Sequence, residues 1–233
     1  MPDLDTIAAQ IHPHLVLRQG ETSDLWLCEH TRRVMGLVQH LCAVPELAED
    51  PPDETAALLA AACANLGWVS EVTSGALHPG LVLHRPTNEQ QREAAVNAVP
   101  SVAANLVPKE VIQLAQEAIR QSHVRDSGTP EAQVLAEAES LADMGLPYIL
   151  RQLRRYAAEG RTTDELLASW NRQHEYHFWE ARINDGLRFE TSRQLARTRL
   201  EAARECVTEM ERQLEGADFV GEGARELGSE GAR

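Results

Sequence analysis

The 233-residue sequence lacks most of the motifs that directly identify the class of a protein. It has no run of about 18 apolar residues, and its first residues carry neither the basic nor the apolar segment of a secretory signal. Its cysteines, Cys28, Cys42, Cys63 and Cys206, lie far apart and form no C-x-x-C pair, which favours buried, reduced thiols over disulfides or a thiolate metal site. We therefore expect a cytoplasmic protein that does not span a membrane.

Several catalytic and binding motifs are also missing. The sequence contains no glycine-rich phosphate loop, no Gly-x-Ser-x-Gly elbow, no cysteine and histidine zinc pattern and no internal repeat of 20–50 residues. Positive charge is scarce, because 22 basic residues face 36 acidic ones and leave a formal net charge of −14. Long-range attraction to nucleic acid or to an anionic membrane is therefore unfavourable, and we expect neither as a partner. A local basic pocket is compatible with this balance.

What the sequence does have is helical periodicity along most of its length. Apolar residues recur at three- to four-residue spacing, as in Leu27, Val34, Leu37 and Leu41, and His30 shares that face, so we expect its side chain to point inward. No segment shows a competing strand pattern. The sequence predicts an all-α fold, and its length suits one helical domain over residues 1–215. Residues 216–233 are rich in Gly, Ala and Glu and are predicted to form a disordered acidic tail.

Proline, glycine and capping residues set the expected helix limits. Asp53 is a candidate N-cap, and Gly67 is the expected end of the helix that follows it. The other expected helices cover residues 24–41, 88–106 with a break near Pro100, 109–123, 131–145, 147–158, 163–183 and 191–214.

Two segments carry a family pattern. The segment Glu29-His30-Thr31-Arg32-Arg33-Val34 and the later segment from Ala56 to Trp68 resemble the opening of an HD domain. HD domains are helical, metal-dependent phosphohydrolases with an H…HD…D ligand set. The resemblance implies an HD-like helical bundle with its core at residues 22–145 and additional C-terminal helices at 146–215. It places His30 at the first histidine of the set.

The same resemblance places Ala64 and Asn65 at the central His-Asp doublet. Alanine has no ligand atom, and asparagine offers only a neutral carbonyl oxygen. Loss of two ligands should weaken metal binding on the order of 10³-fold or more. The resemblance therefore implies a degenerate metal site. We expect no cofactor; if one is bound, it would be a divalent ion such as manganese, iron or zinc.

The acidic end of the ligand set falls in residues 131–141, which are similar to the closing segment of the family. Either Glu137 or Glu139 takes the acidic place, and the sequence leaves the choice open. The simpler interpretation, which we favour, is that both are solvated carboxylates on a helix surface. If the site retains a metal, the resemblance makes His30 and one of these two glutamates its residual ligands.

The middle of the chain is closest in pattern to the HD-GYP branch, which cleaves cyclic dinucleotides. The segment 83–90 resembles the branch segment after the doublet, and it makes His84 an auxiliary ligand candidate. Val99 stands where the branch has a histidine. Gln121 and His123 stand near its His-His-Glu motif, so that Val99 and Gln121 are degenerate positions and His123 is a second auxiliary candidate. The Gly-Tyr-Pro signature itself is absent.

Three sets of charged residues are further candidates. Arg32 and Arg33 follow His30 directly, and we expect one of them to meet any bound anion. The basic cluster of Arg151, Arg154 and Arg155 is expected to pair with acids on neighbouring helices. His174, His177 and Glu180 lie three residues apart and would share one side of a single helix, where packing among aromatic residues is favoured over metal binding.

Three functions are compatible with the sequence. We favour a catalytically inactive HD-like protein that acts in signalling or regulation by binding a protein partner or a small phosphorylated ligand. The alternative is an active phosphohydrolase of nucleotides or phosphate esters, with one metal held by His30, Glu137 or Glu139, and His123 or His84. The third is a structural helical domain, and an acidic helical domain of this size could also form a homodimer.

Overall fold

The computed structural model describes residues 2–19, 21–124 and 128–217, and most of them are helical. The predicted all-α class is confirmed. In the described residues, the only sheet is an antiparallel pair of three-residue strands, β1 (Leu17–Gln19) and β2 (Thr22–Asp24). Strands this short show no alternating pattern, which is why the sequence did not predict them.

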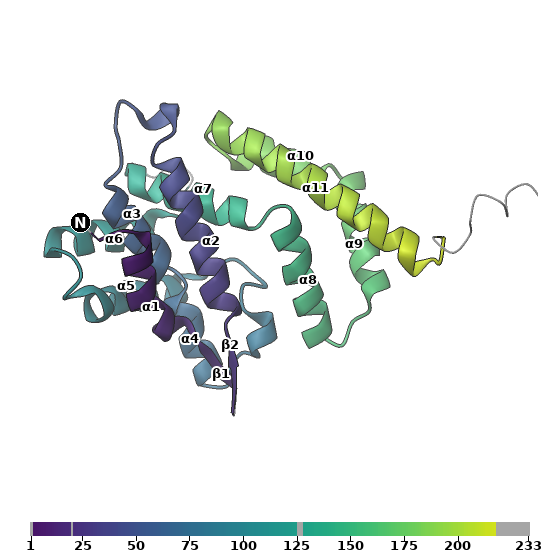
Figure 1. Cartoon of the computed structure of the whole chain (residues 1–233), viewed down its shortest axis with the longest axis horizontal. Helices are drawn as coiled ribbons and strands as arrows, with labels where there is room; N and C mark the ends of the chain where they lie inside the picture. The colour runs from purple at the N-terminus through teal and green to yellow at the C-terminus, as the bar shows by residue number, and fades with distance from the viewer. Residues whose placement is uncertain (1, 20, 125–127, 218–233) are drawn as a thin grey trace, which may run out of the picture.

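The helices form two groups, which Figure 1 shows side by side. The first group contains α1 (Leu4–Leu15), α2 (Trp26–Leu41), α3 (Glu54–Cys63), α4 (Leu66–Thr73), α5 (Glu89–Ala103), α6 (Lys109–Gln121) and α7 (Pro130–Ala142), with short 3-10 turns at Pro45–Leu47 and Pro79–Leu81. The second group contains α8 (Leu146–Ala158), α9 (Thr163–Glu175), α10 (Phe178–Gly186) and α11 (Glu190–Leu214). Helix α11 packs against both α7 and α8, so the second group is docked on the first.

Helix α3 forms the centre of the first group. It packs against α1, α2, α6 and α7, and nine of its residues, from Thr55 to Cys63, are buried. The stretch Glu54–Thr73 is long and apolar enough to cross a membrane, but 78% of its most apolar window is buried inside the structure. Its composition is therefore explained by its place in the core.

The cysteines are free within the described residues, as expected. Cys28 and Cys63 are buried, and Cys42 and Cys206 are half-buried. Burial raises the pKa of the Cys63 thiol to about 12. The Cys63 thiol is therefore a small core group rather than a nucleophile.

The start of α3 agrees with the sequence, whereas the predicted end does not. The Asp53 carboxylate accepts a hydrogen bond of 2.9 Å from the backbone N–H of Ala56, as an N-cap does. Helix α3 stops at Cys63, and Gly67 lies inside α4. A Cβ atom at Gly67 would lie 2.1 Å from the backbone oxygen of Gln91. The glycine thus permits the close approach of α4 to α5 and does not end a helix.

The predicted helix over residues 163–183 is also interrupted. It divides into α9 and α10 at His177, which has a left-handed φ of 53°. His174, His177 and Glu180 therefore do not share one helix face. His174 and Glu180 instead meet at Arg204 of α11, which lies 3.4 Å from His174 Nδ1 and donates to Glu180 at 3.0 Å.

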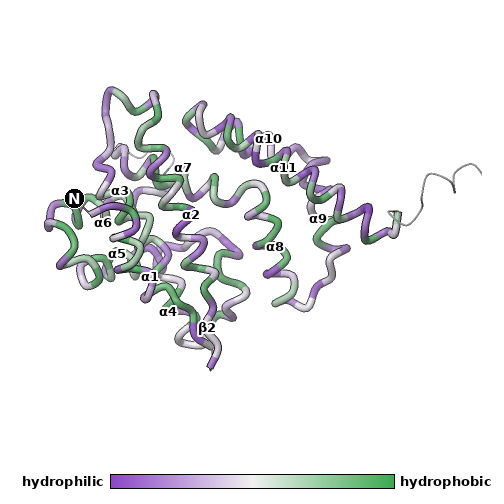
Figure 2. The backbone as a smooth tube through the Cα atoms, in the orientation of Figure 1, coloured by the Kyte–Doolittle hydropathy of each residue, from purple (hydrophilic) through white to green (hydrophobic). Residues whose placement is uncertain are grey.

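Hydropathy follows the packing in the C-terminal group. Figure 2 shows hydrophilic and hydrophobic residues in alternating blocks along α11. Its buried residues recur every three to four positions, at Ser192, Ala196, Leu200, Ala203 and Val207. Most of the predicted tail, residues 218–233, lies outside the described residues.

Candidate functional site

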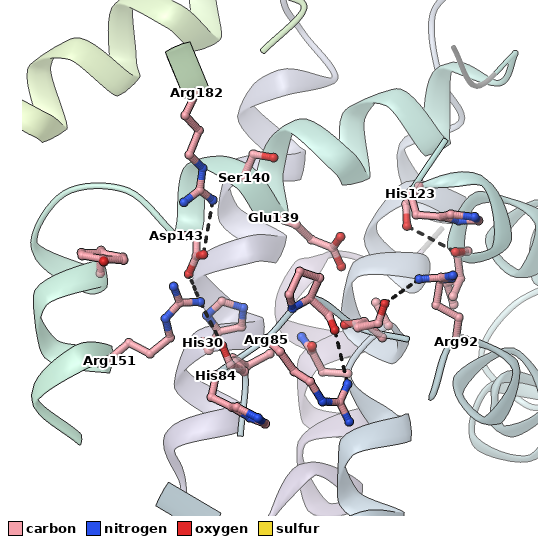
Figure 3. A pocket seen from close by; sticks show the side chains of 18 of the residues that line it. His30, His84, Arg85, Arg92, His123, Glu139, Ser140, Asp143, Arg151 and Arg182 are labelled. Carbon is pink, nitrogen blue, oxygen red and sulfur yellow. Dashed lines mark hydrogen bonds and ion pairs between the residues drawn. The ribbon is translucent and has the colours of Figure 1, made fainter. Parts of the chain in front are cut away.

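A pocket of about 560 Å³ lies between the two helix groups. The first group contributes residues from α2, from the junction of α3 and α4, from the segment 83–87 and from α5, α6 and α7. The second group contributes residues from α8 and α10. Figure 3 shows most of the side chains that line it. Its charged and histidine side chains are His30, His84, Arg85, Arg92, His123, Glu139, Asp143, Arg151 and Arg182.

Six of the residues that the HD-domain resemblance singled out line this pocket. They are His30, Ala64, Asn65, His84, His123 and Glu139. They come from five separate parts of the chain, so local spacing alone does not bring them together. The position of the first histidine and both doublet positions therefore face one cavity.

The other predicted positions lie elsewhere. Val99 is fully buried in the core, and Gln121 donates a hydrogen bond of 2.5 Å to Glu117 on its own helix. Arg32 is exposed and pairs with Asp5 at 3.2 Å, and the Arg33 guanidinium lies 5.4 Å from the centre of the Trp26 ring. Neither arginine lines the pocket. Arg32 lies about 160° from His30 around α2, whereas Arg33 lies only about 60° from it, and its guanidinium is directed to Trp26.

Glu137 and Glu139 face different surroundings. The Glu137 carboxylate is buried away from the pocket and accepts a hydrogen bond of 2.6 Å from the backbone N–H of Arg188. Burial raises the pKa of Glu137, although hydrogen bonds from residues 188, 189 and 192 oppose the shift. Glu139 lines the pocket, where burial raises its pKa to about 7 against the opposing effect of Arg92. Figure 3 shows its carboxylate between Arg92 and Asp143.

His30 is neutral at pH 7. Its side chain is buried, and burial lowers its pKa to about 4, with Arg33 and Arg151 acting in the same direction and Asp143 against them. A neutral imidazole can donate one hydrogen bond and accept another. His30 thus supplies the pocket with a polar group and no charge.

The strongest charge arrangement in the pocket is centred on Asp143, which follows α7. Its carboxylate pairs with Arg151 of α8 and, at 3.3 Å, with Arg182 of α10, as Figure 3 shows. Two guanidinium groups therefore share one carboxylate. Arg151 also donates to the backbone oxygen of Leu83 at 3.1 Å, and Leu83 has a left-handed φ of 64° that is uncommon for a branched side chain.

Two more arginines line the opposite part of the pocket. Arg85 pairs with Glu71 at 3.2 Å and donates to Gln91 at 2.9 Å. Arg92 donates to the backbone oxygen of Thr87 at 2.6 Å, and no carboxylate of the described residues forms an ion pair with it. Glu71 balances the charge of Arg85. The other charged lining residues are three arginines and two carboxylates, Glu139 and Asp143, so the pocket has one excess positive charge, or two when Glu139 is protonated.

The predicted basic cluster is paired with acids, as expected. Arg151 pairs with Asp143, Arg154 with Asp24, and Arg155 with Glu159 at 2.8 Å. Only Arg151 among them lines this pocket. The other pocket arginines, Arg85, Arg92 and Arg182, were not predicted, because no local motif surrounds them.

The donor groups do not fit a metal ion. Across residues 2–19, 21–124 and 128–217, no three His, Cys, Asp or Glu side chains are grouped so as to hold one. Asp143 is engaged by two guanidinium groups, and the Asn65 amide donates to the hydroxyl of Thr31 at 3.2 Å. Ala64 contributes no ligand atom. What the pocket offers instead is guanidinium and imidazole groups, which suit an anion.

Comparisons with known proteins assign no family to this chain. No protein-family model, no curated protein and no solved structure matches it. The likeness to HD domains therefore stays a prediction from sequence.

Proposed function

We propose that this protein is a degenerate HD-like helical protein that binds a small anionic ligand in the pocket and does not carry out metal-dependent hydrolysis. The observation that carries the proposal is the sharing of Asp143 by Arg151 and Arg182. Both arginine side chains are largely buried, at 15% and 25% exposure. An unbalanced cation is costly in such surroundings, and an anion bound beside it would restore the balance.

The place of the pocket supports an HD-like frame. His30, Ala64 and Asn65 occupy the positions that the resemblance gives to metal ligands, and all three line the cavity. In a metal-dependent enzyme, cations at this place would neutralise the substrate. Here arginines from α5, α8 and α10 supply positive charge to the same cavity, and a signalling or regulatory role by ligand binding follows from that substitution.

Binding of an inorganic anion tests the proposal directly. We would titrate inorganic phosphate into the metal-free protein by calorimetry, with a chelator present, and compare the wild type with Arg182→Gln. Loss of one guanidinium contact should weaken phosphate binding about tenfold or more. The matched control is Arg120→Gln, since Arg120 is an exposed arginine on α6 that pairs with Glu93 and Glu117 and does not line the pocket. Equal phosphate binding by all three proteins would contradict the proposal.

The active-enzyme alternative rests on a different observation. His30, His84, His123 and Glu139 all line one cavity, which a rearranged metal site would require. Titration with manganese, iron and zinc, followed by an assay of p-nitrophenyl phosphate hydrolysis, separates the two functions. Metal-dependent turnover that is lost in His30→Ala would replace the binding proposal with a phosphohydrolase. We expect no turnover with any of the three metals.

A further inference from the structure

One wall of the pocket is aromatic. Phe178, the first residue of α10, lines the pocket and leaves 43% of its surface exposed. Its ring packs edge-on against Trp179, with 5.1 Å between ring centres, and the fully buried Trp179 packs in turn against Tyr148 at 4.8 Å. Tyr148 also lines the pocket. The exposed ring is therefore held by a rigid aromatic cluster and is available for stacking.

The aromatic wall lies next to the shared ion pair. Phe178 and Arg182 are four residues apart on α10, and such residues are neighbours on a helix surface with Cβ atoms about 6 Å apart. Arg151 of α8 approaches the same wall, with its guanidinium carbon 5.6 Å from the centre of the Tyr148 ring. The second helix group therefore presents an apolar ring and two cations side by side.

The size of the pocket exceeds the needs of a simple ion. A volume of about 560 Å³ falls in the range of sites that enclose organic molecules, roughly 300–1,000 Å³. Leu83, Pro86 and Ile119 add apolar surface to the lining. A bare phosphate would satisfy the arginines but leave the aromatic and aliphatic wall in contact with water.

We propose that the ligand is an organic anion in which an oxyanion group, phosphate or carboxylate, is attached to an aromatic ring. The oxyanion lies against Arg182 and Arg151, and the ring lies against Phe178. This inference rests on the proposed function, since it requires that the pocket binds anions. It adds the class of ligand and names Phe178 as the residue that selects a ring.

Matched small ligands test the inference. Calorimetry would compare inorganic phosphate, phenyl phosphate and cyclohexyl phosphate, whose ring is apolar but not flat, and benzoate would replace the phosphate by a carboxylate. Phenyl phosphate should bind the wild type about tenfold more tightly than inorganic phosphate and more tightly than cyclohexyl phosphate. Comparison of phenyl phosphate with benzoate identifies the oxyanion, and tighter binding of either one than of inorganic phosphate supports the inference.

Two variants test whether the ring of the ligand contacts Phe178. Phe178→Ala should lose about five- to tenfold in affinity for phenyl phosphate and little for inorganic phosphate, since only the ring contact is removed. The control is Tyr176→Ala, because Tyr176 is 78% exposed and does not line the pocket, and it should bind all ligands as the wild type does. If inorganic phosphate binds and the aromatic anions bind no more tightly, the inference is wrong and the proposed function stands. If none of the anions binds, both fail.

Discussion

The carboxylate of Glu137 on α7 accepts a hydrogen bond of 2.6 Å from the backbone N–H of Arg188, just before α11. A second acid of the first helix group acts in the same way, since Glu46 accepts from the backbone N–H of Thr191 at 2.9 Å. Thr191 lies in the first turn of α11, where the backbone N–H groups have no partner inside the helix, and Arg188 directly precedes the N-cap Phe189. The two carboxylates therefore fix the entry of the chain into α11. A residue that the sequence offered as a metal ligand therefore holds the C-terminal helices in place.

Glu137→Ala should destabilise the protein by about 1–3 kcal/mol, because it removes the buried carboxylate that accepts from the partly buried backbone N–H of Arg188. Glu137→Gln keeps one carbonyl oxygen and should cost less. Urea unfolding measures both changes. The control is Glu205→Ala on the exposed face of α11, which should change the free energy of unfolding by no more than about 0.5 kcal/mol. An equal effect of the two alanine variants would show that Glu137 does not anchor α11.

Glu139 lines the pocket and Glu137 does not, and this difference shows which features could be predicted from the sequence. Leu135, Ala138 and Leu141 define the buried face of α7, and the two glutamates lie on either side of it, about 200° apart around the helix. Because of this angle, only one of the two side chains can face a given cavity. Which one faces the pocket depends on where α8, α10 and α11 pack, and that is tertiary information.

Local sequence patterns predicted other features of the structure only where no distant contact decides them. The inward face of α2 followed from its apolar spacing, and His30 is buried as expected. The turn at His177 contains neither glycine nor proline, so no local signal marked it. The pocket arginines Arg85, Arg92 and Arg182 come from three segments that only the folded chain brings together.

Glu139 should make the protein less stable at higher pH. Its pKa is about 7 in the folded state, above the usual value of 4.5, so the folded state binds more protons than the unfolded state between these pH values. Stability is therefore fully present below pH 4.5 and is lost as the pH rises through 7, by up to about 3 kcal/mol. Glu139→Gln should remove this loss, and its advantage over the wild type should be present at pH 8 and absent at pH 4. Urea unfolding checks this; an unchanged difference in stability between wild type and variant from pH 4 to pH 8 would show that the pocket does not raise the pKa of Glu139.

His30 should make the protein less stable at acidic pH. Burial lowers its pKa to about 4, below the usual 6.5, so the unfolded state binds the proton more readily. Stability should fall as the pH decreases from 6.5 towards 4, by about 3 kcal/mol. His30→Gln should flatten this limb of the stability curve. His14→Gln, at an exposed position on α1, should leave it unchanged.

Two glycine substitutions test the helix packing, because one should lower the stability of the protein and the other should raise it. Gly67→Ala places a Cβ atom 2.1 Å from the backbone oxygen of Gln91, and backbone cannot move aside cheaply, so we expect a loss of several kcal/mol. Gly36→Ala lies within α2 at an exposed position, and its Cβ atom would meet nothing within 4 Å. It should stabilise the protein by about 1 kcal/mol through helix propensity. Thermal unfolding of both variants checks this, and tolerance of Gly67→Ala would refute the close approach of α4 to α5.

Restoring the doublet tests the HD-like frame itself. Residues 64 and 65 line the same pocket as His30, so the double substitution Ala64→His with Asn65→Asp adds an imidazole and a carboxylate where the resemblance predicts metal ligands. The Thr31 hydroxyl, which now accepts from the Asn65 amide at 3.2 Å, can donate to a carboxylate in its place. Affinity for manganese or zinc should rise on the order of 10³-fold by calorimetry. Adding His30→Ala to the double variant should cancel the gain, because the three groups would act as one ligand set. A folded double variant with unchanged metal affinity would mean that residues 64 and 65 do not occupy the doublet, and the HD-like interpretation would then be lost while the arginine pocket remained.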